Sequence, residues 1–376
     1  MTLAVISHTA HFLQNGQVVG WGPTVRELNH LPEVFDRIVH LAPLHTGDPP
    51  PGSLPYADER IRLEALRPVG GPGWQDKGRA FRQAPAVLRS VRRVLRDADL
   101  FQFRAPTGMG VYLIPWLTHR HQGPGWYKYA GDWQARGTPA THTWQRYWLA
   151  YRQERPVTIN GRWPDQPQHC HSFENPCLGA AERQAGLRSL QNKDYDGPVK
   201  ICFVGRMVEA KGVLPLLKAM NEWDAARPNL EWHWVGDGPL YPLVREAARH
   251  LKARVSCHGI LSRPALAAVY ADCQLLLLPS STEGFPKVVA EAANYGCLPI
   301  VTDVSCLGQY VCHGHNGWLI PRRALRGEGL ERVLREALGQ RSAWPAMAGR
   351  AFRMASAFTF SHYHERIKRL VVELVD

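Results

Sequence analysis

Two glutamates with seven residues between them, Glu283 and Glu291, stand out in the segment SSTEGFPKVVAEA, directly after the apolar run LLLLP. The apolar run predicts a buried strand, and Pro286 is well placed to be the first residue of a helix. Glu283 at the strand exit could then bind sugar hydroxyls, the amides at the helix start could hold a phosphate, and Glu291 could accept two hydroxyls of a ribose. Taken alone, the segment favours the plainer interpretation of two surface glutamates.

A second segment, GRMVEAKG at residues 205–212, places two cations after another apolar run. It lacks the pattern of a phosphate-binding P-loop or of GxGxxG. Arg206 and Lys211 instead lie near the start of an expected helix, where the helix dipole and unpaired backbone amides also favour an anion. The segment therefore suits a diphosphate, although basic residues at helix starts are often only solvated.

The second half of the chain alternates strand and helix patterns. This alternation predicts a mostly parallel sheet with helices on both faces. Ligands of such sheets bind beyond the carboxyl ends of the strands, so the loops after Gly205, Gly236, Gly259 and Pro279 should form one rim. The expected strands are residues 199–205, 231–236, 254–259, 275–279, 298–302 and 317–320, and the expected helices are residues 213–223, 240–250, 263–272 and 286–295.

The first half opens in the same way. A strand at residues 3–6 leads through a glycine-bearing segment, which includes Gly16 and Gly22, to a helix from about Thr24. Further strands are expected at residues 37–41, 100–103, 126–130 and 156–159. Trp, Tyr and His side chains are frequent in residues 112–148, and this composition suits a carbohydrate-binding cleft.

The net charge of +12 is distributed unevenly. Residues 77–96 contain seven basic residues and no acidic one. A helix from about Pro85 would place apolar side chains on one side and Arg89, Arg92, Arg93 and Arg96 largely on the other. Such a helix could be a core helix with a solvated face, a site that docks on an anionic membrane, or a nucleic-acid contact. No nucleic-acid-binding module accompanies it, so no nucleic-acid partner is expected.

Composition narrows the class of protein further. A chain of 376 residues with 45% hydrophobic side chains fits two globular domains. The eight cysteines form no CxxC pair and are expected to be reduced, and the isolated HxH pairs and His169-Cys170-His171 lack the partners of a closed metal site. The first residues lack the pattern of a signal peptide, so a cytoplasmic protein that does not span the membrane is expected.

The blocks FVGRMVEAKG, WVGDGPL, VSCHGIL, LLLLPSSTEGFPKVVAEAANYGCLPIVTD and HNGWLI, taken together, resemble the nucleotide-sugar half of glycosyltransferase family 4. They occur in the family's order across residues 201–320. The resemblance implies an α/β fold of the GT-B type, with two Rossmann-like domains facing across a cleft and a C-terminal helix crossing back to the first domain. It implies an acceptor domain at residues 1–170, a linker at 171–197, a nucleotide-sugar domain at 198–355, and a terminal helix at 356–376 with an apolar stripe.

The resemblance also assigns roles to residues in the second half. Arg206 and Lys211 match the pair that neutralises the donor diphosphate, which would make a metal unnecessary. Glu283 matches the glutamate that contacts the transferred sugar, and Glu291 matches the ribose ligand. The remaining donor-binding positions are Gly205, the backbone cradle of Gly284, Phe285, Pro286 and Lys287, and the base-bordering Ile260 and Leu261.

The first half resembles the family less closely. Gly16 lies in the segment that would match the loop approaching the donor. Many relatives carry a His-Asp pair at the tip of a late strand, and Asp132 is the expected match for the acid, whereas the histidine is absent. His8, His11 and Arg104 are all candidates to replace it, and loop or core packing is the alternative for each.

These expectations combine into a retaining glycosyltransferase. It would move a sugar from a UDP- or GDP-sugar to a glycan or lipid-linked acceptor, in surface polysaccharide or glycolipid biosynthesis and peripherally on the inner face of the membrane. In this fold group a donor phosphate oxygen takes the acceptor's proton, so no dedicated protein base is implied. The alternatives are a nucleotide-sugar epimerase or phosphorylase of the same fold, and a non-catalytic binder of sugar nucleotides or nucleic acid.

Overall fold

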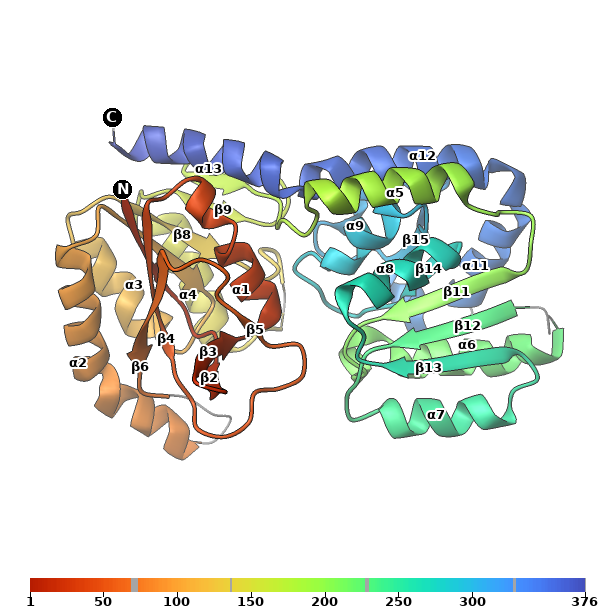
Figure 1. Ribbon diagram of the computed structural model, residues 1–376, viewed down its shortest axis with the longest axis horizontal. Helices are drawn as coiled ribbons and strands as arrows, with labels where there is room; N and C mark the ends of the chain where they lie inside the picture. Colours follow the sequence, from red (N-terminus) through yellow and green to blue (C-terminus); the bar gives the residue numbers. More distant parts are fainter. Residues whose placement is uncertain (69–73, 136, 227–229, 327–328, 376) are drawn as a thin grey trace. The chain divides into compact units, whose positions relative to one another are not determined.

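A computed structural model of the chain describes residues 1–376 except 69–73, 136, 227–229, 327–328 and 376. The chain divides into two compact units (Figure 1). Unit 1 consists of Met1–Glu174 with Tyr363–Asp376, and unit 2 is Asn175–His362. The α/β class expected from the alternating pattern is confirmed in both units.

Unit 1 is built on a seven-stranded parallel sheet with the strand order β10-β9-β8-β7-β1-β4-β6. Its strands are β1 (Thr2–Ile6), β4 (Arg37–Pro43), β6 (Ile61–Leu66), β7 (Leu100–Ala105), β8 (Gly125–Tyr129), β9 (Val157–Ile159) and β10 (Cys170–Ser172). Its helices are α1 (Gly22–Leu28), α2 (Trp74–Arg96), α3 (Gly110–His119), α4 (Ala140–Tyr151) and most of α13 (Phe360–Val375), with a short 3-10 helix at Leu31–Glu33.

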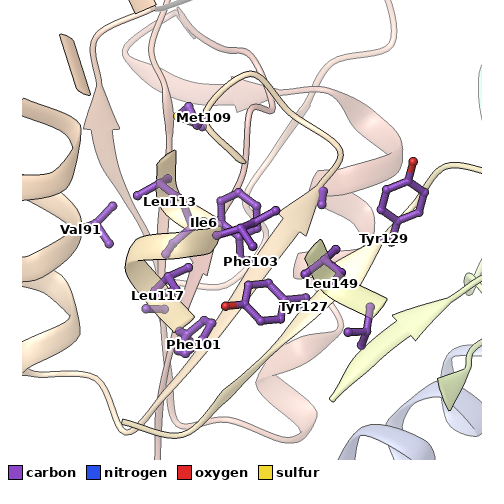
Figure 2. Packing of buried hydrophobic residues seen from close by; sticks show 14 of the residues in the cluster. Ile6, Val91, Phe101, Phe103, Met109, Leu113, Leu117, Tyr127, Tyr129 and Leu149 are labelled. Atoms are coloured by element: carbon purple, nitrogen blue, oxygen red, sulfur yellow. The ribbon is translucent and has the colours of Figure 1, made fainter. Parts of the chain in front are cut away.

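Side chains of alternate residues on β1 pack into two different cores, as expected for a strand that is covered on both faces. Ala4 and Ile6 lie in a core with α2, α3 and α4, part of which is seen in Figure 2 around Phe103 and Leu113. The intervening Leu3 and Val5 lie in the opposite core with α1 and α13. The apolar run of residues 3–6 is explained by this double coverage.

Helix α13 covers the second core through the stripe predicted from the sequence. Tyr363, Ile367, Leu370 and Val371 are all buried there, and Leu374 packs at its margin. Arg366 adds a cation–π contact over Phe173, with its Cζ 4.3 Å from the ring centroid. The last helix of the chain therefore belongs to the core of the first unit, as the predicted fold class requires.

A buried carboxylate connects α13 to the sheet. Glu27 of α1 accepts hydrogen bonds from Arg104 of β7 (2.9 Å), Lys128 of β8 (2.6 Å) and the hydroxyl of Tyr363 (2.9 Å). Arg104 also donates to Gln102 at 2.8 Å. Burial and the charge of Glu27 raise the pKa of Tyr363 well above its ordinary value, so its hydroxyl remains a donor. The guanidinium of Arg104 is thereby satisfied within an otherwise apolar face, while the amide nitrogen of Gln102 has no hydrogen-bond partner in the described part of the chain.

Helix α2 extends further than the sequence pattern predicted. The expected start at about Pro85 is wrong, because the helix begins at Trp74 and Pro85 lies inside it. The predicted amphipathicity is confirmed for its described side chains. Val87, Val91 and Leu95 are buried in the core, and the four arginines Arg89, Arg92, Arg93 and Arg96 are exposed.

The segment after β1 forms a hairpin and not the expected glycine loop. Strands β2 (His11–Gln14) and β3 (Gln17–Gly20) pair antiparallel, and β5 (Leu54–Pro55) extends them into a small sheet. Asn15 and Gly16 both have positive φ, at 51° and 78°, which is the requirement of a tight two-residue hairpin turn. Gly16 is therefore needed for the turn of this hairpin.

Unit 2 is built on a six-stranded parallel sheet with the order β13-β12-β11-β14-β15-β16. Its strands are β11 (Val199–Val204), β12 (Leu230–Val235), β13 (Arg254–Gly259), β14 (Leu275–Leu278), β15 (Leu298–Thr302) and β16 (Trp318–Ile320). Its α-helices are α5 (Ala180–Asn192), α6 (Val213–Ala226), α7 (Tyr241–His250), α8 (Arg263–Asp272), α9 (Lys287–Asn294), α10 (Leu307–Tyr310), α11 (Gly329–Gly339) and α12 (Trp344–Ala355). Short 3-10 helices lie at Glu209–Lys211, Arg322–Arg326, Arg341–Ala343 and Ser356–Phe358.

The stretch 171–197, expected to be a linker, contains regular structure. Its first residues belong to β10, the two units meet in sequence at Glu174 and Asn175, and residues 180–192 form helix α5 of unit 2. The eight cysteines are free, and Cys312 is the exposed one among them. None of the described helices is both long enough and apolar enough to cross a bilayer.

We expect Glu27→Ala to destabilise unit 1 strongly, because Arg104 and Lys128 would remain buried without their counter-charge. Removing one partner of a buried ion pair typically costs about 3–5 kcal/mol. Urea unfolding followed by tryptophan fluorescence measures the change. The control is Asp58→Ala, which removes a surface pair with Arg60 and should leave the midpoint almost unchanged. Equal effects of the two substitutions would contradict a structural role for the Glu27 network.

Candidate functional site

The strand order of unit 2 reverses direction at one position, between the neighbouring strands β11 and β14. The chain runs from β11 outward through β12 and β13, and then returns to β14 on the other side of β11. Open α/β sheets bind ligands at such a switch point, outside the carboxyl ends of the two central strands. The loops that follow β11 and β14 are therefore the first place to look for a site. They carry Arg206, Lys211 and Glu283.

These two loops are held together by backbone contacts. The amide of Ser281 donates to the carbonyl of Ala210 at 2.9 Å. Gly212 has φ +74°, and a Cβ built on it would lie 2.0 Å from the carbonyl oxygen of Pro279. Only glycine combines this backbone conformation with such a close approach. The close approach brings the side chains at the two strand exits within reach of each other.

Lys211 and Glu283 form an ion pair across the switch point. The Nζ of Lys211 lies 2.5 Å from Oε1 of Glu283. The Glu283 side chain is 6% exposed and that of Lys211 is 28% exposed, so the pair lies at the edge of the solvent. Arg206 in the same loop is exposed, and its side chain forms no ion pair with any residue that the structure describes. The structure thus brings together two of the three predicted catalytic residues, Lys211 and Glu283. The third, Arg206, lies in the same loop as Lys211 and is exposed.

The turn between the two glutamates is rigidly supported. The carbonyl of Gly284 accepts hydrogen bonds from the hydroxyl of Ser305 (2.9 Å) and the thiol of Cys306 (3.4 Å). Phe285 stacks on Phe358 with ring centroids 4.2 Å apart. Pro286 is the N-cap of α9 and not its first residue, which shifts the helix start to Lys287. The amide of Val289 donates to the carbonyl of Pro286 at 3.0 Å, and the start of a helix favours an anion through its dipole.

Glu291 lies inside α9 in a separate polar cluster. Its side chain is 8% exposed. Oε1 accepts from Arg263 Nη1 at 3.1 Å, and Oε2 accepts from the Tyr270 hydroxyl at 3.4 Å. Arg263 also contacts Glu182 of α5 at 2.8 Å. Sequence reasoning missed this cluster, because Glu182 and Arg263 are 81 residues apart and no motif relates them.

Two buried hydroxyls add to the polar character of this sheet edge. Ser280 follows β14, and Thr302 is the last residue of β15. Both are fully buried, and neither hydroxyl has a hydrogen-bond partner within the described part of the chain. Buried hydroxyls are normally satisfied, so a bound water or a ligand group is expected at each.

The predicted base-bordering residues lie at the carboxyl end of β13. Ile260 follows the strand directly and is 48% exposed, which is unusual for an isoleucine. Leu261 is half-buried beside it. They occupy the same edge of the unit 2 sheet as the loops after β11 and β14.

In unit 1 the acceptor candidates separate into different environments. Arg104 is occupied by the buried Glu27 network. His8 is exposed directly after β1, and its pKa is lowered by desolvation and by the nearby charge of Arg104. The carboxylate of Asp132 accepts the amide of Gln134 at 3.0 Å and so stabilises its own turn. Among these three, His8 is the side chain best placed to meet a ligand.

His11 is buried in a chain of hydrogen bonds. Its Nδ1 lies 2.9 Å from the Thr9 carbonyl, which makes Nδ1 the donor and Nε2 the acceptor of the Tyr56 hydroxyl at 2.9 Å. Tyr56 in turn contacts His40 Nδ1 at 2.8 Å, and His40 Nε2 contacts Ser7 Oγ at 2.7 Å. Burial lowers the pKa of both histidines. His11 is thus a neutral core residue that supports the loop carrying His8.

No group of three or more His, Cys, Asp or Glu side chains among the described residues is arranged to hold a metal ion. His169 contacts the carbonyl of Leu149 at 2.9 Å, and His313 contacts Glu336 at 2.9 Å. Both histidines therefore have ordinary protein partners.

Part of the chain, which includes this site, is similar in sequence to known proteins. Residues 198–336 match the family model described as glycosyl transferases group 1. A glycogen synthase from Alkalilimnicola ehrlichii is 30% identical over 146 residues, which cover 38% of this chain and 30% of that protein. An alpha-D-kanosaminyltransferase from Streptomyces kanamyceticus is 28% identical over 156 residues, 40% of each chain. The chain thus spans less than half of the length of these curated relatives.

Solved structures resemble the whole chain. Sucrose-phosphate synthase from Thermosynechococcus elongatus has a TM-score of 0.72 at 17% identity, over 99% of this chain and 98% of its own. Anabaena HepE in complex with UDP and glucose has a TM-score of 0.68 at 17% identity, over 100% of both chains. The fold is therefore of the GT-B type, which confirms the fold class expected from the sequence.

We expect Gly212→Ala to disrupt the site much more than Gly16→Ala. Both glycines have similar positive φ values, but a Cβ at Gly16 meets nothing within 4 Å. Gly16→Ala should therefore cost only the backbone strain of about 1–2 kcal/mol. Gly212→Ala should in addition separate the loops at Ala210 and Ser281. The measurement is the melting temperature of each variant together with its rate of digestion by trypsin after Lys211. Equal behaviour of the two variants would contradict the close-approach argument.

Proposed function

We propose that the protein is a retaining glycosyltransferase that moves a sugar from a nucleoside-diphosphate sugar to a glycan or lipid-linked acceptor. The observation that carries the proposal is the Lys211–Glu283 pair at the switch point of unit 2. This pair lies within the stretch that matches the glycosyl transferases group 1 model. A cation beside a carboxylate at this position suits a ligand that carries both negative charge and hydroxyl groups.

The donor would lie along the carboxyl edge of the unit 2 sheet. Glu283 would accept hydrogen bonds from hydroxyls of the transferred sugar, and the backbone of residues 284–287 would hold the distal phosphate at the start of α9. Glu291 would accept the ribose hydroxyls. The base would lie against the exposed side chain of Ile260 and the neighbouring Leu261.

Catalysis would depend on charge neutralisation of the departing diphosphate. When the sugar–phosphate bond breaks, negative charge develops on the leaving oxygen, and Lys211 and Arg206 would stabilise that charge. These two cations would supply the electrostatic role that a metal ion has in other transferases, so we propose a metal-independent reaction. A donor phosphate oxygen would take the acceptor's proton on the retained face. Glu283 would then act by orienting the sugar.

UDP-sugars are the first donors to test. Anabaena HepE was solved with UDP and with UDP-glucose, and a pneumococcal O-GlcNAc transferase of related fold was solved with UDP and GlcNAc. GDP-sugars remain within the proposal because Ile260 and Leu261 would contact the base through apolar atoms, which do not discriminate strongly between bases.

We expect Lys211→Ala to lower the rate of sugar transfer by about 10²–10³-fold, the usual effect of removing one group that stabilises transition-state charge. Glu283→Gln should lower it by about 10²-fold, because the transferred sugar would lose its orientation. Nucleoside diphosphate release from a panel of UDP- and GDP-sugars measures the rate, with water or added glycans as acceptors. Because the two residues touch, the double variant should lose less than the product of the single losses.

The matched control for this assay is Lys200→Ala, which removes the ion pair between Lys200 of β11 and Asp272 of α8 in the same unit and should leave the rate unchanged. NMR of the anomeric proton in the product reports retention or inversion. Conversion of the donor sugar to an isomer without any acceptor would identify an epimerase and contradict the proposal.

The surface of α2, α3 and α4 supports a membrane-associated acceptor. Of the four exposed arginines of α2, Arg92 adjoins an aromatic side chain, with its Cζ 5.7 Å from the ring centroid of Trp116 on α3, and Arg93 pairs with Glu64. Helix α4 continues with paired Trp144 and Trp148 and with the exposed Tyr147 and Tyr151. Basic residues beside Trp and Tyr are typical of proteins that bind the interface of anionic membranes. We therefore propose that unit 1 docks on anionic lipid through this face.

We expect the wild-type protein to sediment with vesicles that contain phosphatidylglycerol and not with pure phosphatidylcholine. Arg89/Arg92/Arg93/Arg96→Ala should abolish the difference, because each basic residue near an anionic surface contributes about 1 kcal/mol. A charge-matched control, Arg245/Arg249/Arg332/Arg335→Ala, removes exposed arginines of unit 2 and should bind as the wild type does. Loss of binding in both variants would point to net charge alone, and loss in neither would exclude this face.

A further inference from the structure

Arg263 is the first residue of α8, and its guanidinium lies between two carboxylates. Nη1 contacts Oε1 of Glu291 at 3.1 Å. Nε and Nη2 contact a single oxygen of Glu182 at 3.1 and 2.8 Å, and Nη2 also donates to the carbonyl of Cys177 at 3.3 Å. All three guanidinium nitrogens are therefore engaged, and only one of them by Glu291.

The Glu182 side of this arrangement is fixed independently. The second oxygen of Glu182 accepts the amide of Gly179 at 2.7 Å, in the capping position of α5. Arg263 is thus anchored to α5 by three contacts that do not involve Glu291. An arginine held in this way serves as a fixed support for the Glu291 carboxylate, and it would not leave easily if a ligand arrived.

The Glu291 carboxylate is held at both oxygens. Tyr270 donates to Oε2 at 3.4 Å, while Arg263 donates to Oε1. Burial and the nearby charge of Glu291 raise the pKa of Tyr270 well above its ordinary value, so this hydroxyl remains a donor. Burial opposes the charge of Arg263, but Glu291 and Glu182 raise the pKa of Arg263 overall, so it remains a cation. Such partners offset the cost of burying a carboxylate that is only 8% exposed.

We propose that Arg263, anchored by Glu182, is a positioning residue that fixes the Glu291 carboxylate for the ribose of a nucleoside diphosphate. This inference rests on the proposed function, in which Glu291 accepts the ribose hydroxyls. Each ionised carboxylate oxygen accepts about two hydrogen bonds, so one contact from Arg263 and one from Tyr270 leave capacity for two hydroxyls. Preference for ribose over 2′-deoxyribose then depends on Arg263, which itself does not touch the nucleotide.

The test compares affinities for UDP and GDP with those for 2′-deoxy-UDP and 2′-deoxy-GDP by titration calorimetry. We expect the wild type to prefer the ribonucleotide by about tenfold or more, as for a hydrogen bond to a charged group. Arg263→Ala should reduce the preference to within about twofold. Arg263→Lys should not restore it, because one ammonium cannot span both carboxylates with fixed geometry. Glu182→Gln should give an intermediate preference.

Arg335→Ala removes an exposed pair with Glu331 on α11 and serves as the control, with an unchanged preference. If Arg263→Ala does not fold, as judged by its thermal unfolding, Glu182→Gln carries the test, because it loosens Arg263 without removing the counter-charge of Glu291. The ratio of affinities is the decisive quantity, since general destabilisation would weaken binding of both nucleotides alike.

The possible results separate the two proposals. Wild-type protein that binds none of the four nucleotides would contradict the proposed function. Binding with a ribose preference that survives in Arg263→Ala or, where that variant does not fold, in Glu182→Gln would overturn the positioning role alone. Tighter binding in Arg263→Ala would also overturn it, because Arg263 would then compete with the ribose for Glu291.

Discussion

The close approach of two loops, one after β11 and one after β14, is the constraint on which the candidate site depends. Gly212 allows the backbone to pass directly over the carbonyl of Pro279, and the resulting geometry places Lys211 against Glu283. The residue that would neutralise the leaving diphosphate thereby touches the residue that would orient the sugar. A ligand that binds one of them must also meet the charge of the other, which favours a molecule that joins a phosphate to a hydroxyl-rich ring.

The two units share a strand order around their first strand but use it differently. In unit 1, the charged residues of the central strands, Arg104 and Lys128, are paired with Glu27 inside the fold. In unit 2, Arg206, Lys211 and Glu283 follow the two central strands and lie at the carboxyl edge of the sheet. The first arrangement secures the terminal helix through Tyr363, and the second leaves charge available for a ligand. The same architecture thus supplies a stable scaffold in one unit and a polar site in the other.

The sequence predicted unit 2 well because its pattern is regular. Each buried parallel strand is a short apolar run, and the intervening helices have recognisable starts, so the loop positions of Arg206, Lys211 and Glu283 followed directly. Helix α5 was not predicted, because it is polar along most of its length and has Gly186 as its described buried residue. The hairpin around Gly16 was not predicted either, although Asn-Gly is a typical two-residue turn between strands. The flanking strands are only four residues long each, which gives a weak strand pattern.

Contacts between residues distant in sequence lay beyond the sequence patterns. Nothing in the motif that contains Glu291 indicates that its carboxylate is held by Arg263, or that Arg263 is in turn anchored by Glu182 of another helix. The same is true of Glu27, whose partners come from two strands and from the last helix of the chain. Such networks depend on how the elements pack, and single-sequence periodicity carries no information about it.

The most direct test of the account is a crystal structure of the protein with UDP, or with GDP if that nucleotide binds more tightly. The account predicts a diphosphate between Lys211 and the backbone of residues 284–287, with Arg206 turned toward it and the ribose on Glu291. A nucleotide bound elsewhere, or one whose phosphates lie away from the switch point between β11 and β14, would contradict it.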